Sequence, residues 1–113
     1  MMQIDLPYPP SNNRYWRTFR GRNVVSAEAK SYKSEVAALC LEQGLQPVDG
    51  PVAVTLRIRR PAKRRDLDNH LKVLLDALEA YAYHNDNQVF ALSAAMVDDK
   101  ANPGVTVRIE RME

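Results

Sequence analysis

Two carboxylates near the middle of the chain, Asp66 and Asp68, have the type and spacing that suit metal-dependent chemistry. On an extended backbone, side chains two residues apart point to the same side, so these carboxylates would lie close together. Close carboxylates repel each other and favour either a proton or a cation between them. A hard divalent ion such as Mg²⁺ takes oxygen ligands and keeps several of its waters. The pair therefore indicates half of a metal site.

A convincing site needs a third carboxylate, and Asp86 is the first candidate because it follows the second expected helix in a polar loop. Asp76 is the competing candidate, since it lies on the same helix face as Lys72. If the helix continues to Tyr83, roughly 22 Å separates its two ends, and spacing alone does not decide between the candidates. A metal-activated water could attack a phosphodiester, with Lys72 or a nearby arginine stabilising the charge of the transition state.

The same residues also have a purely structural interpretation. Asp68 could be the N-cap of the second helix, and Asp66 could pair with Arg64 or Arg65. Lys72 could pair with acids one turn away on the helix surface. The stretch is not an EF-hand, because the glycine and the final glutamate of that loop are absent.

A second concentration of functional residue types lies in residues 14–22. Four arginines alternate there with three aromatic residues: Arg14, Arg17, Arg20 and Arg22, with Tyr15, Trp16 and Phe19. Such a segment suits phosphate contact combined with base stacking. The alternative is a short hairpin whose aromatic residues belong to the core and whose arginines face solvent. Another basic cluster runs from Arg57 to Arg65.

Composition fits one small globular domain over residues 1–113, with a core of only marginal stability, so help from a partner subunit is plausible. The net charge of +2 is too small to establish nucleic-acid binding. The single cysteine, Cys40, lies on an apolar helix stripe and is expected in the core. We expect His70 and His84 at the surface, because they lack partner cysteines and metal spacing. No apolar run approaches a membrane span and the N-terminus lacks a signal peptide, so we expect a cytoplasmic protein.

Hydrophobic periodicity predicts an α+β fold, a mixed β-sheet with two packed α-helices. Strands are expected at 3–6, 52–59, 89–96 and 105–110, the third with two buried faces and a hairpin-type connection at 98–104. One helix should begin after the N-cap Ser26 and end near Gly44. The other should run from Asp68 or Asn69 to about Tyr83. Its predicted buried stripe is Leu71, Leu74, Leu75, Leu78 and Ala82.

With these residues in view, the sequence resembles the RusA family of Holliday junction resolvases, small endodeoxyribonucleases often carried by phages and prophages. Its matching segments are Pro9-Pro10-Ser11-Asn12-Asn13-Arg14-Tyr15, Gly21-Arg22, Val25-Ser26-Ala27-Glu28, Arg65-Asp66-Leu67-Asp68-Asn69, Lys72, Asp76-Ala77-Leu78 and Asp86-x-Gln88-Val89. Separated motifs in the right order are more specific than either alone.

The resemblance implies a homodimer that binds four-way DNA junctions and nicks two opposed strands symmetrically, using Mg²⁺ or Mn²⁺, in DNA recombination and repair. A two-fold protein presents one site to each of two equivalent strands. By position, the family's catalytic, metal-binding carboxylates match Asp66, Asp68 and Asp86, and its essential lysine matches Lys72. Further residues near that site match Arg65 and Asn69. The segment before Asp86 is one residue shorter than the family pattern, so Asp86 is aligned through Gln88-Val89.

Two alternatives remain open from the sequence. One is a metal-dependent nuclease with broader branched-DNA or flap activity. The other is a non-catalytic, basic DNA-binding module whose carboxylates only order its own arginines.

Overall fold

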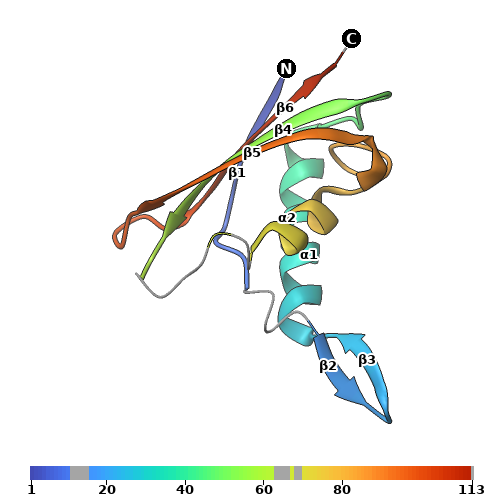
Figure 1. Ribbon diagram of the computed structural model, residues 1–113, viewed down its shortest axis with the longest axis vertical. Helices are drawn as coiled ribbons and strands as arrows, with labels where there is room; N and C mark the ends of the chain where they lie inside the picture. The colour runs from blue at the N-terminus through green and yellow to red at the C-terminus, as the bar shows by residue number, and fades with distance from the viewer. Residues whose placement is uncertain (11–15, 63–66, 68–69, 113) are drawn as a thin grey trace.

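The fold is a four-stranded mixed β-sheet with two α-helices on one face and a separate β-hairpin (Figure 1). A computed structural model describes residues 1–10, 16–62, 67 and 70–112. The strand order is β1 (Met2–Leu6), β6 (Gly104–Arg111), β4 (Val52–Arg60) and β5 (Val89–Asp98). Strand β4 pairs antiparallel with β6 and parallel with β5. The predicted α+β class, a mixed sheet with two packed helices, is confirmed.

The core lies between the helices and the covered face of the sheet. Alternate residues of the two central strands are buried there, as their period-two pattern predicts: Val52, Val54, Leu56 and Ile58 in β4, and Val105, Val107 and Ile109 in β6. Cys40 is 1% exposed, and burial raises the pKa of its thiol. The prediction of a core cysteine is therefore confirmed.

Helix α1 (Ala27–Glu42) begins and ends where the sequence predicts. The side chain of Ser26 accepts a hydrogen bond from the backbone N–H of Ala29 at 3.2 Å, which caps the first turn. Gly44 follows the helix with φ +68°, a left-handed conformation that glycine adopts without steric cost. The backbone N–H of Leu45 then donates to the carbonyl of Cys40, and the helix closes in a Schellman motif.

Helix α2 (Leu71–Leu78) is shorter than predicted, because it ends at Leu78 and not near Tyr83. Glu79 takes extended backbone angles, and Ala80 has φ +77°. The chain reverses sharply at Ala80. This left-handed conformation costs an alanine roughly 1–2 kcal/mol. The start predicted at Asp68 or Asn69 lies outside the described residues.

The buried face of α2 is also rotated from the predicted stripe. Leu74 and Leu78 are buried as expected, whereas Leu71 and Leu75 are only half-buried. Val73 and Ala77 are buried in their place. A periodic pattern identifies an apolar side of a helix, but packing against α1 and the sheet selects which part of it is covered.

Strand β5 is an edge strand, so the prediction of two buried faces is wrong. None of its residues is buried, and Phe90 is 70% exposed. A run of apolar residues is typical of a central strand covered on both sides, but here helices cover only one face. The connection after β5 is not a hairpin either, because β5 and β6 both pair with β4 and not with each other.

Strands β2 (Trp16–Phe19) and β3 (Arg22–Val25) form an antiparallel hairpin that projects beyond the N-terminal end of α1 (Figure 1). Arg20 and Gly21, at φ +52° and +74°, make its two-residue turn. Two positive φ angles are the mark of the type I′ turn that suits the twist of hairpin strands. The backbone hairpin expected as one alternative is therefore present. The burial of Tyr15, Trp16 and Phe19 would test the rest of that alternative, and these side chains lie outside the part of the chain that the structure describes.

No helix in the described part of the chain combines the length and the apolar character that crossing a membrane requires.

Candidate active site

His70 anchors the start of α2 to the segment that follows β1. Its ring is fully buried, and Nε2 lies 2.7 Å from the hydroxyl of Tyr8. The two rings also meet edge to face, with centroids 4.9 Å apart. The prediction of a surface histidine is wrong at this position, because a neutral imidazole can be buried once its polar atoms have partners. His84 is exposed as predicted and lies 2.7 Å from Asp49.

The contact between Tyr8 and His70 joins a residue before the N-terminal motif to a residue after the acidic motif. Tyr8 stands just before the segment that contains Arg14 and Tyr15, and His70 directly follows Asn69. The described residues next to the basic-aromatic segment and next to the acidic pair are therefore in contact.

Lys72 lies on the first turn of α2 and is half exposed. Its Nζ atom is 3.5 Å from Oδ2 of Asp76, one helical turn further on. The Asp76 side chain is only 19% exposed, so the pair is partly shielded from solvent. The expected placement of Asp76 on the same helix face as Lys72 is confirmed, and their contact is the one that the purely structural interpretation of Lys72 describes.

Tyr83 completes the end of α2 and fixes the chain that returns from it. Its ring is fully buried, and its hydroxyl donates a hydrogen bond of 2.6 Å to the carbonyl of Leu75. The last four carbonyls of a helix have no partner within the helix, and Leu75 carries one of them. The backbone N–H of Ala80 donates to the carbonyl of Tyr83, which closes the turn.

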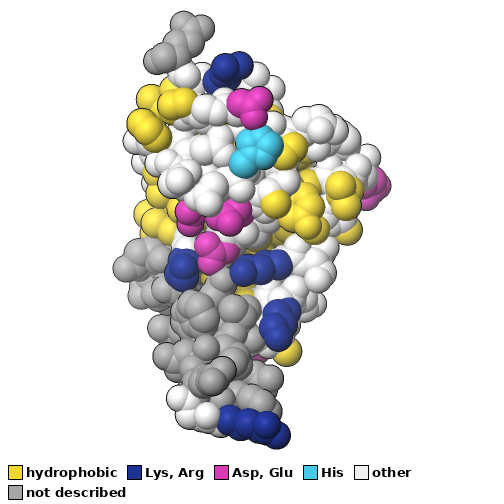
Figure 2. Space-filling view, turned by 90° about the vertical axis from the view of Figure 1, so that its right-hand side faces the viewer, with side chains coloured by type: hydrophobic (Ala, Val, Ile, Leu, Met, Phe, Trp, Pro, Cys, Tyr) yellow, Lys and Arg dark blue, Asp and Glu magenta, His cyan; other side chains and the backbone are white. Residues whose placement is uncertain are grey.

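The negative charges of three carboxylates act on the pKa of the Tyr83 hydroxyl. Burial raises the pKa of the Tyr83 hydroxyl, and the charges of Asp86, Glu79 and Asp76 raise it further, in that order. Asp76 lies in the last turns of α2, Glu79 is the C-cap of that helix, and Asp86 lies on the segment that returns from it. Figure 2 shows acidic side chains gathered across the middle of one face, with Lys and Arg side chains directly beside them.

Asp86 begins the short 3-10 helix η3 (Asp86–Gln88) and is exposed. Its backbone N–H donates to Oε2 of Glu79 at 3.1 Å, so the end of α2 and the start of η3 are joined. An eight-residue helix is about 12 Å long, compared with roughly 22 Å for the helix that the sequence predicted. A cleft of about 310 Å³ between α1 and α2 adjoins Asp76 and Glu79 and has Lys33 on its opposite wall.

The structure brings together part of the predicted site and leaves part undescribed. Lys72, Asp76 and Asp86 occupy α2 and the segment that returns from it. Among the described residues, no three Asp, Glu, His or Cys side chains form a group that could hold a metal ion. The remaining predicted site residues fall outside the described ones, as a whole or in their side chains: Arg14, Tyr15, Arg64, Arg65, Asp66, Asp68 and Asn69, with the side chains of Arg17 and Arg22. Arg20 is exposed at the tip of the hairpin.

A family model described as endodeoxyribonuclease RusA matches residues 7–110 of this chain. The chain belongs to the RusA family. RusA proteins are endodeoxyribonucleases, which hydrolyse phosphodiester bonds within DNA strands, and this chain is one of them.

Similar RusA proteins come from bacteria and from a phage. A crossover junction endodeoxyribonuclease RusA of Escherichia coli strain K12 is 43% identical over 89 residues, 74% of this chain and 72% of the relative. Another from Escherichia coli O139:H28 is 42% identical over 91 residues, 76% of this chain and 73% of the relative. The protein of the same name from Enterobacteria phage 82 is 42% identical over 89 residues, 74% of this chain and 72% of the relative.

Sequence reasoning missed three residues that shape this region. The Glu79 carboxylate accepts a hydrogen bond from the backbone N–H of Asp86. The Tyr83 hydroxyl donates to α2, and the Gln88 amide donates to the carbonyl of Val48. The sequence could have pointed to Gln88, because this residue belongs to the motif Asp86-x-Gln88-Val89. No sequence pattern pointed to Tyr83, because its position suggested only the last turn of a longer helix.

The raised pKa of Tyr83 makes stability dependent on pH in the alkaline range. Above pH 10 the unfolded chain releases a phenolic proton that the folded chain keeps, so the free energy of unfolding falls as pH rises. The expected slope is about 1.4 kcal/mol per pH unit for each such tyrosine. Tyr32 contributes in the same way, because burial and then Glu35 raise its pKa.

Tyr83→Phe should therefore lower this slope by about 1.4 kcal/mol per pH unit above pH 10, in urea unfolding measured from pH 9 to 11.5. Tyr32→Phe is the matched variant and should have the same effect on the slope. At neutral pH, Tyr83→Phe should cost about 1–3 kcal/mol, because the Leu75 carbonyl loses its donor. A slope equal to that of the wild type would show that Tyr83 ionises alike in both states.

Proposed function

We propose that this protein is a Mg²⁺-dependent nuclease that resolves Holliday junctions by paired symmetric nicks, in DNA recombination and repair. We propose further that it acts in the cytoplasm and that residues 1–113 form a single domain. The observation that carries this proposal is membership of the RusA family, together with 42–43% identity to relatives named crossover junction endodeoxyribonucleases. The placement of Lys72 and Asp76 on α2, with Asp86 on the segment that returns from this helix, supports it.

The residues we assign to metal binding are Asp66, Asp68 and Asp86. The chemistry of this donor set fits Mg²⁺, with Mn²⁺ as a substitute, because all three supply carboxylate oxygens. Asp86 fits the role as it stands: it is exposed, and its backbone is fixed through Glu79. Among the described residues, none donates a hydrogen bond to its carboxylate. When bound, the ion would activate water for attack on the phosphodiester.

We assign Lys72 to the reaction and Asp76 to its support. Lys72 is half exposed, so its ammonium group can reach a bound strand and stabilise the negative charge that develops on the phosphate. Asp76 lies 3.5 Å from Nζ and restricts where that group can point. Of the two candidates for a third carboxylate, Asp76 is thus engaged with Lys72, which favours Asp86 for the metal.

The residues we assign to DNA binding lie on the hairpin segment and on the basic loop before α2. They are Arg14, Tyr15, Arg17, Arg20 and Arg22, with Arg64, Arg65 and Asn69. The projecting hairpin supports this assignment, because it extends from the body of the protein with Arg20 exposed at its tip (Figure 1). Arginine and tyrosine side chains on such an extension suit phosphate contact and base stacking.

We also propose that the protein acts as a homodimer. A four-way junction offers two equivalent strands, and a two-fold dimer presents one site to each. The open edge of β5 supports association, because Phe90 is 70% and Leu92 41% exposed on a strand with one free side. Exposed apolar side chains on an edge strand are typical of surfaces that meet another chain.

Asp68→Asn should abolish cleavage of a synthetic four-way junction while binding of that junction persists. Removing one metal-binding carboxylate weakens the metal site but leaves the basic contacts that bind DNA. Paired nicks on opposed strands, their Mg²⁺ requirement and junction affinity in chelator can be measured on one labelled substrate. Glu42→Gln, which changes an exposed carboxylate at the C-terminal end of α1, is the control and should cut normally.

The same assay separates the alternatives. Cleavage that survives chelation would contradict the metal mechanism. Equal cutting of junctions, flaps and linear duplex would favour a broader branched-DNA nuclease. Binding without any cleavage, at every divalent ion tested, would favour the non-catalytic DNA-binding module.

Lys72→Ala should lower the cleavage rate by about 100-fold and change junction affinity much less, because charge stabilisation acts mainly in the transition state. Single-turnover rates and binding in chelator give the two quantities separately. Lys100→Ala is the control, since it removes an exposed lysine in the connection between β5 and β6. A rate equal to that of the wild type would remove Lys72 from the chemistry.

Light scattering should show a species of about twice the 12.8 kDa chain mass. Phe90→Ser should shift the population towards monomer, because it removes apolar area from the edge strand. Leu41→Ser makes a similar change at an exposed residue of α1 and should leave the mass unchanged. A wild-type monomer at the concentrations used for cleavage would contradict the dimer.

A further inference from the structure

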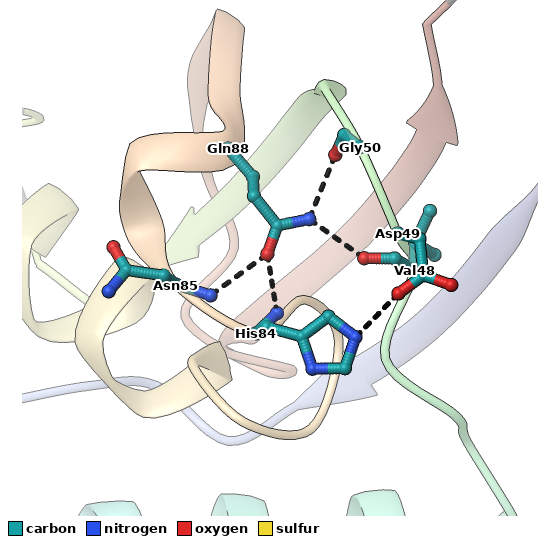
Figure 3. A network of polar contacts seen from close by, with 6 residues as sticks. All are labelled: Val48, Asp49, Gly50, His84, Asn85 and Gln88. Atoms are coloured by element: carbon teal, nitrogen blue, oxygen red, sulfur yellow. Dashed lines mark hydrogen bonds and ion pairs between the residues drawn. The ribbon is translucent and has the colours of Figure 1, made fainter.

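The side chain of Gln88 joins the segment that carries Asp86 to the segment that leads into β4 (Figure 3). Its Oε1 atom accepts from the backbone N–H groups of His84 at 2.7 Å and Asn85 at 2.9 Å. Its Nε2 atom donates to the carbonyls of Val48 and Gly50, both at 2.8 Å. One side chain therefore fixes backbone atoms on both segments.

This arrangement uses the full hydrogen-bonding capacity of an amide. A glutamine has two amide protons to donate and two lone pairs to accept with, and all four are engaged here. The opposite orientation of the amide would place its NH₂ against two N–H groups and its oxygen against two carbonyls. No other type of side chain of this length matches two donors on one side and two acceptors on the other.

The four bonds act directly on the backbone around Asp86. His84 and Asn85 immediately precede Asp86, and Asn85 also accepts from the N–H of Asn87 at 2.9 Å. The backbone N–H of Asp86 itself donates to the carboxylate of Glu79 at the end of α2. The segment at Val48 is in turn joined to the return from α2, because its N–H donates to the carbonyl of Ala82. Asp86 itself is exposed, so its placement depends on these backbone bonds and not on packing of its side chain.

We propose that Gln88 is a positioning residue that sets the location of the Asp86 carboxylate for metal binding. The proposal rests on the role assigned to Asp86 under the proposed function. Residues that orient a metal ligand without touching the ion commonly change metal affinity or activity by about 10- to 100-fold when replaced. Gln88 would act in this way through the backbone of the η3 turn.

The test compares Gln88→Met, which keeps the shape and removes all four bonds, with Gln88→Glu, which keeps only the two accepted bonds. Both should raise the half-saturating Mg²⁺ concentration for junction cleavage about tenfold and weaken Mn²⁺ binding, followed by electron paramagnetic resonance, by a similar factor. Junction affinity in chelator should not change. Gln46→Met makes the same chemical change at an exposed glutamine and should match the wild type in every measurement.

The outcomes separate this proposal from the function on which it rests. If Asp86→Asn cuts and binds metal normally, the role of Asp86 fails and Gln88 has no ligand to position. If Asp86→Asn loses metal binding while both Gln88 variants keep wild-type Mg²⁺ dependence, the positioning role alone is overturned. A lower melting temperature with unchanged Mg²⁺ and Mn²⁺ dependence would likewise overturn it and leave Gln88 a residue of stability only.

A measurement on the wild type covers the case in which the variants do not fold. The two Nε2 protons of Gln88 should exchange with solvent more slowly than those of Gln46, because both are bound to carbonyls. Equal exchange rates in nuclear magnetic resonance spectra would show that the four-bond network does not persist in solution, and the proposal would fall.

Discussion

The parallel pairing of β4 with β5 is the constraint on which the candidate site depends. Antiparallel neighbours can be joined by a two-residue turn, whereas parallel neighbours need a crossover of a dozen or more residues. Residues 61–88 form this crossover, and they include α2, the return from it and η3. Every carboxylate assigned to catalysis lies within it. The sheet topology therefore determines that acids from both sides of α2 belong to one connection.

The return from α2 is stabilised by individual polar contacts more than by regular secondary structure. Its backbone leaves the helix at Glu79, and backbone groups outside helices and strands need partners elsewhere. The Gln88 amide accepts from two backbone N–H groups of this return and donates to two carbonyls of the segment before β4, while the Tyr83 hydroxyl donates to a carbonyl in the last turn of α2. This combination leaves Asp86 on the surface while the backbone that carries it is bonded on both sides. An exposed carboxylate on a fixed backbone suits the metal-binding role that we propose for Asp86.

Covering the sheet on one face only has consequences for the rest of the molecule. The helices bury the apolar side chains of β4 and β6, while β5 remains at the edge with Phe90 exposed (Figure 1). The hairpin of β2 and β3 extends from the opposite end of α1. A small domain thus presents an open edge, a projecting hairpin and an acidic face, the surfaces that we propose for a partner subunit, for DNA and for metal.

The sequence alone determined the α+β class, the limits of α1, and the alternation in β4 and β6. It also identified Lys72, Asp76 and Asp86 as candidates. These results follow from local rules, because capping, periodicity and residue chemistry act over a few neighbouring positions.

Tertiary structure decided where α2 ends, that β5 is an edge strand, and that His70 is buried against Tyr8. It also decided that the return from α2 brings Asp86 to Glu79. The edge position of β5 and the burial of His70 depend on contacts between residues distant along the chain. The end of α2 and the approach of Asp86 to Glu79 depend on polar contacts over seven or eight positions, which hydrophobic periodicity does not register. An apolar run does not show whether neighbours will cover it, and a polar side chain does not show whether a partner will meet it. Folding decided both when it left β5 at the edge of the sheet and turned the chain back at Glu79 and Ala80.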